Sequence, residues 1–132
     1  MSGSADPPEQ HGAADPLDPV RAHIDAFNAR DLEGVLATFA DDAVFAAGDE
    51  LVVGVRSLRL LFGDAFAAPV DAKLALRHAV VQGDVVACEL TETLTVETTS
   101  HDLEVAAFYT VRRGELTRVK IYRDLSEPEG RG

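Results

Sequence analysis

Two ionisable side chains of this chain lie in apolar segments, where they could carry out proton transfer. His23 lies beside an apolar helical stripe formed by Val20, Ile24 and Phe27. Glu89 lies in a long run, residues 85–97, that is rich in β-branched residues and predicts a strand. A carboxyl group enclosed by apolar side chains holds its proton more tightly than one in water, which suits a general acid or base. The two residues predict acid–base chemistry if the fold brings them into one cavity.

Each candidate also has a purely structural interpretation. Glu89 could be solvated or lie in a dimer contact, and His23 could be a helix-face histidine bonded to Asp25 or water. Tyr109 offers a hydroxyl that could bind a carbonyl or phenol oxygen, or it could be an ordinary amphipathic core tyrosine. Arg123 could hold a ligand carboxylate or be exposed at the end of a strand.

Helices precede strands along this chain. Residues 20–39 predict two helices broken at Asp31, which is a good N-cap, with Asp18 and Pro19 at the start of the first and Asp41-Asp42 ending the second. A third helix is predicted over 57–66. The predicted strands are 44–45, 52–53, 73–81, 85–97, 103–112 and 116–124, with turns at 82–84 and 113–115 and a loop at 98–102. The order indicates an α+β fold with a curved, mainly antiparallel sheet.

Composition narrows the classes of function. The 132 residues suit one domain, and a hydrophobic content of 46% supports a core. The net charge of −11 disfavours nucleic acid as a partner. The apolar runs are too short for a membrane span, and the N-terminus has no secretory pattern, so we expect a cytoplasmic protein. Cys88 is a single cysteine and predicts a buried apolar group, and no metal-ligand spacing is present in the sequence.

Residues 1–18 and 126–132 carry little that could be buried, and we expect both to be disordered tails. The domain between them is residues 19–125. It resembles the nuclear transport factor two-like superfamily, in particular the SnoaL-like and ketosteroid-isomerase-like branch. The resemblance rests on AFNARDLEGVLATFADDAVF (26–45), on Val53-Gly54-Val55-Arg56 and on FYTVRRGELTRVKIYRDL (108–125). It implies a cone-shaped fold in which three helices pack on the sheet and leave a pocket.

The resemblance also allows known active sites to be compared position by position. The catalytic tyrosine and the general-base aspartate of ketosteroid isomerases fall on His23 and Ala47, and their second aspartate falls near Ala107, so steroid-type isomerisation is not expected. The Arg–Asp–Asp set of limonene-type epoxide hydrolases falls on Glu89, Thr91 and Ile121 and is absent too. SnoaL-like cyclases vary more in their polar groups and stay open.

The family pattern places three sets of strand residues toward the cavity: Glu89, Thr91 and Thr93; Val105, Ala107 and Tyr109; and Val119, Ile121 and Arg123. A shift of one residue on the second long strand would turn Leu90, Leu94 and Val96 inward instead. We therefore predict Glu89 and His23 as catalytic residues. The predicted substrate-binding residues are Tyr109, Thr91, Thr93, Arg123, Ile121, Ala107 and Phe27.

The expected function is that of a SnoaL-like small-molecule pocket protein. We expect an acid–base enzyme without cofactor or metal, either a cyclase, an isomerase, a dehydratase or a hydrolase, acting on a small apolar carbonyl- or hydroxyl-bearing metabolite. The alternative is a non-catalytic ligand-binding or assembly domain. Either would form a homodimer through the open sheet face, for which the sequence offers Val86, Cys88, Leu90, Leu94, Val96 and Phe108.

Overall fold

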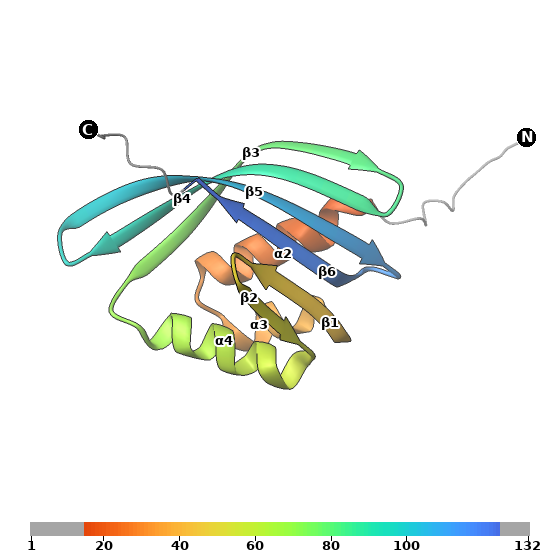
Figure 1. Cartoon of the computed structure of the whole chain (residues 1–132), viewed down its shortest axis with the longest axis horizontal. Helices are drawn as coiled ribbons and strands as arrows, with labels where there is room; N and C mark the ends of the chain where they lie inside the picture. Colours follow the sequence, from red (N-terminus) through yellow and green to blue (C-terminus); the bar gives the residue numbers. More distant parts are fainter. Residues whose placement is uncertain (1–14, 125–132) are drawn as a thin grey trace, which may run out of the picture.

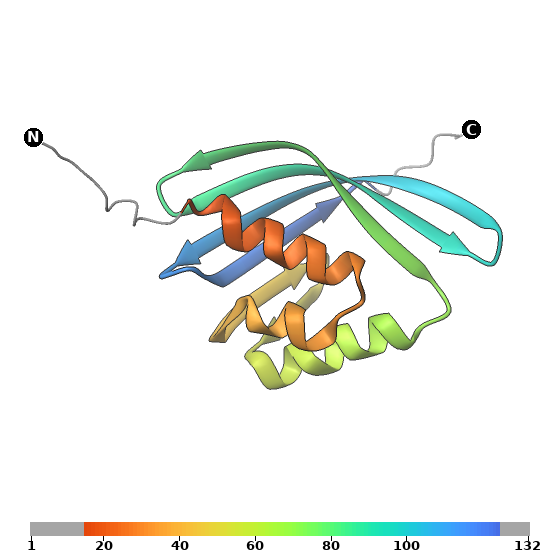
Figure 2. The same ribbon diagram turned by 180° about the vertical axis from the view of Figure 1, so that it is seen from behind.

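The computed structural model describes residues 15–124. Helices α2, α3 and α4 cover one face of a curved six-stranded sheet, which confirms the predicted α+β cone (Figures 1 and 2). The helices are α2 (Leu17–Asn28), α3 (Leu32–Ala37) and α4 (Val55–Ala67). The strands are β1 (Phe39–Ala47), β2 (Glu50–Val53), β3 (Asp71–Gln82), β4 (Val85–Val96), β5 (Thr99–Arg112) and β6 (Glu115–Arg123).

The first helix begins two residues before the predicted position at Pro19. Pro16 is the N-cap of α2, and the Asp15 carboxylate accepts a hydrogen bond from the Leu17 backbone N–H at 2.9 Å. Residues 17 and 18 of the expected tail are therefore helical. The rest of that tail, apart from 15 and 16, and all of 126–132 lie outside the described residues.

The predicted cap of the second helix is confirmed. The Asp31 carboxylate accepts a hydrogen bond from the Gly34 backbone N–H at 3.0 Å, which satisfies one free donor of the first turn. The helix ends at Ala37, however, and Asp41-Asp42 lie inside β1 rather than at a helix end. Both aspartates are exposed there, so their charge does not conflict with the strand.

The strand order is β2-β1-β6-β5-β4-β3. All neighbours are antiparallel except β1 and β6, which run parallel. The loop predicted over 98–102 is instead a tight turn at Glu97-Thr98, after which β5 starts at once. This turn contains no glycine; Glu97 itself takes the left-handed backbone conformation with a φ of 55°.

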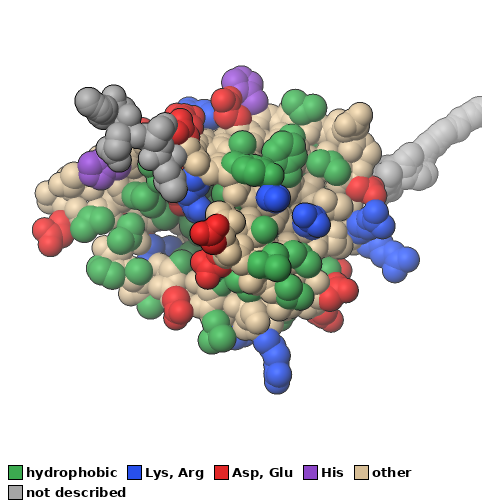
Figure 3. Space-filling view, viewed as in Figure 1, with side chains coloured by type: hydrophobic (Ala, Val, Ile, Leu, Met, Phe, Trp, Pro, Cys, Tyr) green, Lys and Arg blue, Asp and Glu red, His purple; other side chains and the backbone are tan. Residues whose placement is uncertain are grey.

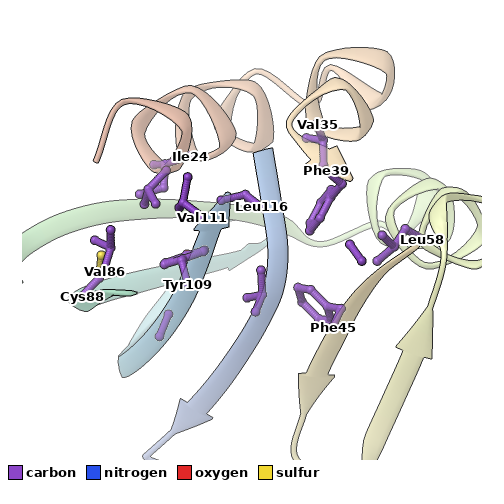
Figure 4. Packing of buried hydrophobic residues seen from close by; sticks show 14 of the residues in the cluster. Ile24, Val35, Phe39, Phe45, Leu58, Val86, Cys88, Tyr109, Val111 and Leu116 are labelled. Carbon is purple, nitrogen blue, oxygen red and sulfur yellow. The ribbon is translucent and has the colours of Figure 1, made fainter. Parts of the chain in front are cut away.

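The hydrophobic core lies between the inner face of the sheet and the helices (Figure 4). Leu58 of α4, Leu116 of β6 and Val35 of α3 are fully enclosed in it. On β4 the even-numbered residues Val86, Cys88 and Leu90 point into this core. Burial raises the pKa of the Cys88 thiol to about 11, so this residue is the inert apolar group that was predicted.

Two polar side chains tie the end of α2 to β3. Asn28 donates from Nδ2 to the Leu74 carbonyl at 2.9 Å and accepts from the Leu74 N–H at 2.7 Å. Arg30, which has a φ of 54°, donates to the Phe66 carbonyl and pairs with Asp71 at 3.3 Å. These contacts hold one wall of the cavity described below.

Within the described part of the chain, no helix is long and apolar enough to cross a membrane.

Candidate functional site

A cavity of about 350 Å³ lies between the inner face of the sheet and helices α2 and α4. Its opening is visible as a hollow between the sheet and α4 in Figure 3. Apolar side chains form most of its wall: Phe27, Phe45, Ala47, Leu61, Phe62, Ala65, Ala68, Val70, Ala72, Leu74, Leu90, Val105, Ala107 and Ile121. The polar lining residues are His23, Glu50, Glu92, Tyr109 and Arg123.

The cavity contains one buried carboxylate, and it belongs to Glu92 rather than Glu89. Glu92 is only 4% exposed, and its Oε1 accepts a hydrogen bond from Arg123 Nε at 2.9 Å. Among residues 15–124 its second oxygen, Oε2, has no hydrogen-bond partner, and neither do the two terminal nitrogens of Arg123. A buried carboxylate costs free energy unless its oxygens are paired. The free oxygen next to free guanidinium nitrogens is therefore suited to a ligand.

Glu89 faces the opposite side of the sheet, so the prediction that it lines the cavity is wrong. Its side chain is 58% exposed, and its Oε1 lies 2.6 Å from Nδ1 of His78 on the neighbouring strand β3. The predicted pair of Glu89 with His23 is also wrong, because His23 is enclosed on the inner face.

Thr91 and Thr93 share the outward side of β4 with Glu89 and do not line the cavity, contrary to the prediction. Thr91 accepts a hydrogen bond from Arg77 Nε at 3.0 Å, and Thr93 donates to Asp102 at 2.7 Å. The register of β4 is the one-residue shift that the sequence left open, although of the three residues predicted for that shift only Leu90 lines the cavity, and Leu94 and Val96 do not. This shift brings Leu90 inward, and Glu92 with it, although the latter was not singled out from the sequence.

Residues on the next two strands and on α2 lie where the sequence placed them. The cavity wall contains Ala107 and Tyr109 of β5, Ile121 and Arg123 of β6, and Phe27 of α2. Their contact with a substrate stays a prediction. Val119 also points inward, but it is part of the core below the cavity.

His23 lies in a cluster of aromatic rings. Its ring centroid is 5.3 Å from that of Phe39 and 6.0 Å from those of Phe62 and Tyr109, in edge-on arrangements. Burial lowers the pKa of His23 to about 4, so the imidazole is neutral near pH 7. Burial also raises the pKa of Tyr109, with the Cys88 thiol adding to the effect, so the phenol keeps its proton.

No group of three or more His, Cys, Asp or Glu side chains that could hold a metal ion occurs within residues 15–124. The polar groups of the cavity are therefore one ion pair, one neutral imidazole and one phenol, together with Glu50 at the exposed opening. Such groups are able to move protons and to bind oxygen atoms of a ligand.

Comparison with known proteins agrees with this geometry. The sequence model of the SnoaL-like domain family matches residues 20–119. The chain belongs to this family. Its fold is that of the nuclear transport factor two-like superfamily, as the resemblance implied. No match is found among the curated proteins.

Several solved structures share this fold. TerC co-crystallised with polyporic acid is 22% identical, covers 83% of this chain and 91% of its own, and superposes with a TM-score of 0.72. An LEH-like epoxide hydrolase from M. tuberculosis is 22% identical over 83% of each chain, with a TM-score of 0.75. A putative SnoaL-like polyketide cyclase from Shewanella denitrificans is 14% identical over 83% of this chain and 90% of its own, with a TM-score of 0.73. At these sequence identities, the similarity to solved structures shows a shared fold and nothing more.

Proposed function

We propose that this SnoaL-like protein is an acid–base enzyme that moves a proton on the carbon next to a carbonyl group of a small, mainly apolar metabolite. The observation that carries the proposal is the Glu92–Arg123 pair in a cavity with apolar walls, in which one carboxylate oxygen and the terminal guanidinium nitrogens have no partner among residues 15–124. No cofactor is needed for such a step.

The reaction follows from the adjacency of these two groups. Arg123 would donate hydrogen bonds from its terminal nitrogens to the substrate carbonyl oxygen. Glu92 Oε2 would then take a proton from the neighbouring carbon, and the electrons of the C–H bond would move onto the oxygen to form an enolate. The positive guanidinium stabilises this negative charge, and the apolar walls strengthen the interaction. Return of the proton to another carbon gives an isomer, and attack of the enolate carbon on a second carbonyl gives a cyclised product.

The relatives support an enzymatic role for this fold and do not fix the reaction or the substrate. Among the solved structures with this fold, one protein is described as a putative polyketide cyclase and another as an epoxide hydrolase. A cavity of about 350 Å³ is within the range that small-molecule sites occupy. Either kind of substrate would be mainly apolar and would carry oxygen atoms.

A direct test is exchange of the α-protons of a simple ketone in D2O. We expect the wild-type protein to accelerate exchange on 4-phenylbutan-2-one above the buffer rate, as followed by proton NMR. Ala107→Leu fills part of the cavity and is expected to remove most of this acceleration, since Ala107 is in its wall. Ala106→Leu adds the same atoms on the exposed outer face and is the matched control.

A result in which the wild-type protein and buffer exchange the ketone protons at the same rate would contradict the proposal. The outcome would then favour the second candidate function, a ligand-binding domain without chemistry. One observation favours that function: two positions at which ketosteroid isomerases carry catalytic acids are Ala47 and Ala107 here, and both line the cavity.

We also propose that two copies pair through the outer face of the sheet. The predicted contact residues Val86, Cys88 and Leu90 are wrong, because they are buried in the core. The outer face instead exposes Phe108, Tyr122 and Val80. Figure 3 shows apolar side chains interspersed with charged ones over the sheet. Glu89 and Glu104 lie toward one end of this face, and Lys120 and Arg118 toward the other. A two-fold related copy would therefore place acidic groups against basic groups.

A further inference from the structure

The inner end of the cavity holds a second set of polar groups, which the proton-transfer step does not use. Tyr109 is 2% exposed, and its hydroxyl has no hydrogen-bond partner among residues 15–124. Buried hydroxyl groups are nearly always hydrogen-bonded, because an unpaired one costs free energy. Since Tyr109 lines the cavity, a ligand can supply the missing partner.

His23 offers the complementary group. The Thr38 hydroxyl donates its only hydrogen to the Val35 carbonyl at 2.6 Å, so its oxygen can only accept from His23 Nδ1, 3.4 Å away. A neutral ring that carries its proton on Nδ1 has a bare lone pair on Nε2. This nitrogen has no partner within the part of the chain that the structure describes.

The two groups together match one functional group of a ligand. The rings of His23 and Tyr109 are 6.0 Å apart between centroids, and the two side chains are not hydrogen-bonded to each other. A ligand hydroxyl could donate to Nε2 of His23 and accept from the hydroxyl of Tyr109. A carbonyl oxygen could accept from Tyr109 but would leave Nε2 unpaired.

The strand register gives the separation of the two ends of the cavity. Arg123 is paired with Val105, which lies four residues before Tyr109 on β5. Four residues of a strand span about 13 Å. The aromatic side chains of Phe27, Phe45 and Phe62 form part of the cavity wall. An elongated and flat apolar body fits such a space.

We propose that His23 and Tyr109 form a hydroxyl-binding subsite, so that the ligand is an elongated, mainly apolar molecule with a hydroxyl group, of the phenol type, at the inner end and a carbonyl at the Arg123 end. The carbonyl end of this assignment rests on the proposed function. The hydroxyl end rests only on the two buried and unpartnered groups.

The test uses three probes that share a ketone and differ at the far end of the ring. They are 4-(4-hydroxyphenyl)butan-2-one, 4-(4-methoxyphenyl)butan-2-one and 4-phenylbutan-2-one, and the affinity of each is measured by NMR titration. We expect the hydroxyl probe to bind about 10-fold more tightly than the phenyl probe, the value of one net hydrogen-bonded group at a buried site. The methoxy probe cannot donate to His23 and is expected to lose this advantage.

Two variants assign the effect to the subsite. Tyr109→Phe is expected to reduce the hydroxyl preference to less than about 2-fold while the phenyl probe binds as before. Tyr122→Phe is the matched control, because Tyr122 is exposed on the outer face. The preference should persist in this control.

The proposal is overturned if the hydroxyl and phenyl probes bind the wild-type protein equally, if neither binds at millimolar concentration, or if the preference survives in Tyr109→Phe. The first two outcomes need no variant, so a variant that fails to fold does not prevent a decision. Proton exchange on the same samples separates the two proposals. A hydroxyl preference without exchange contradicts the proposed function alone, and exchange without the preference contradicts the subsite alone.

Discussion

At the scale of single residues, the ion pair in the cavity has unequal partners. The Glu92 side chain is almost fully enclosed, whereas the Arg123 side chain is 37% exposed. Removing the arginine would leave a buried negative charge without compensation, which costs more than the pair itself contributes. Arg123 is therefore needed to keep Glu92 inside the fold, in addition to its proposed role in binding a ligand.

We expect Arg123→Met to lower the free energy of unfolding by roughly 2 kcal/mol, less than a fully buried pair would lose because water reaches the guanidinium. Adding Glu92→Gln to this variant should restore part of the loss. Urea unfolding of the two single variants and the double variant would measure this coupling. If the loss of unfolding free energy in the double variant equals the sum of the losses in the two single variants, the two side chains do not interact.

His23 makes stability depend on pH in a defined window. The pKa of His23 is about 4 in the folded protein, below its ordinary value of 6.5. Above pH 6.5 the His23 side chain is neutral in both the folded and the unfolded state, so its burial causes no pH-dependent loss of stability. As the pH falls from 6.5 to 4, the unfolded state binds a proton that the folded state does not, and stability is lost.

The size of this loss is about 3 kcal/mol by proton linkage. We expect the wild-type unfolding free energy to decrease by about this amount more than that of His23→Phe between pH 7 and pH 4. His78→Ala, at an exposed site on the outer face, should follow the wild type. Parallel curves for wild type and His23→Phe would show that His23 is not buried as a neutral ring.

At the scale of elements, Asn28 is one of the two polar side chains that hold β3 against the end of α2. Asn28 satisfies both the N–H and the carbonyl of Leu74, a residue in the cavity wall. We expect Asn28→Ala to lower the free energy of unfolding by about 1–3 kcal/mol, because two backbone groups lose their partner. Asn28→Asp keeps only the hydrogen-bond acceptor, so its free energy of unfolding should lie between those of the wild type and of Asn28→Ala. Thermal unfolding that does not distinguish the three proteins would contradict this role.

The register of β4 shows what the sequence could and could not predict. Apolar residues at the even positions Val86, Cys88 and Leu90 already indicated the inner face, and following this alternation to position 92 would have found Glu92. The family pattern pointed to the odd positions instead. Since the side-chain period of a strand is two, one residue of error exchanged Glu92 for Glu89.

The other strands of the site were easier to predict. The tight turn at Arg113-Gly114 fixes how β5 and β6 pair, and Tyr109, Ala107 and Arg123 accordingly lie on the expected face. The order of helices and strands was also predicted, because apolar periods of both kinds are clear in the sequence. The position of His23 relative to the carboxylate depends on packing between α2 and the sheet, which no local pattern contains.

At the scale of the whole molecule, the outer sheet face leaves large apolar side chains in water. Phe108 is 45% exposed there and packs edge-on against Tyr122 at 6.0 Å between ring centroids. We expect Phe108→Glu to weaken self-association at least 10-fold, because a charge would replace an apolar contact. Leu60→Glu on α4, where the leucine is also exposed, is the control and should leave the oligomer intact. Light scattering that shows a monomeric wild type at micromolar concentration would contradict the proposed dimer.

The most direct test of the whole interpretation compares two glutamates that lie three residues apart on the same strand. Glu92 lies inside the cavity with Arg123, and Glu89 lies outside with His78. The measurement is the rate of α-proton exchange of 4-phenylbutan-2-one in D2O for Glu92→Gln and Glu89→Gln. We predict a loss of about 100-fold or more in Glu92→Gln and an unchanged rate in Glu89→Gln. An unchanged rate in Glu92→Gln, or an equal loss in both variants, would contradict the assignment of Glu92 as the catalytic base.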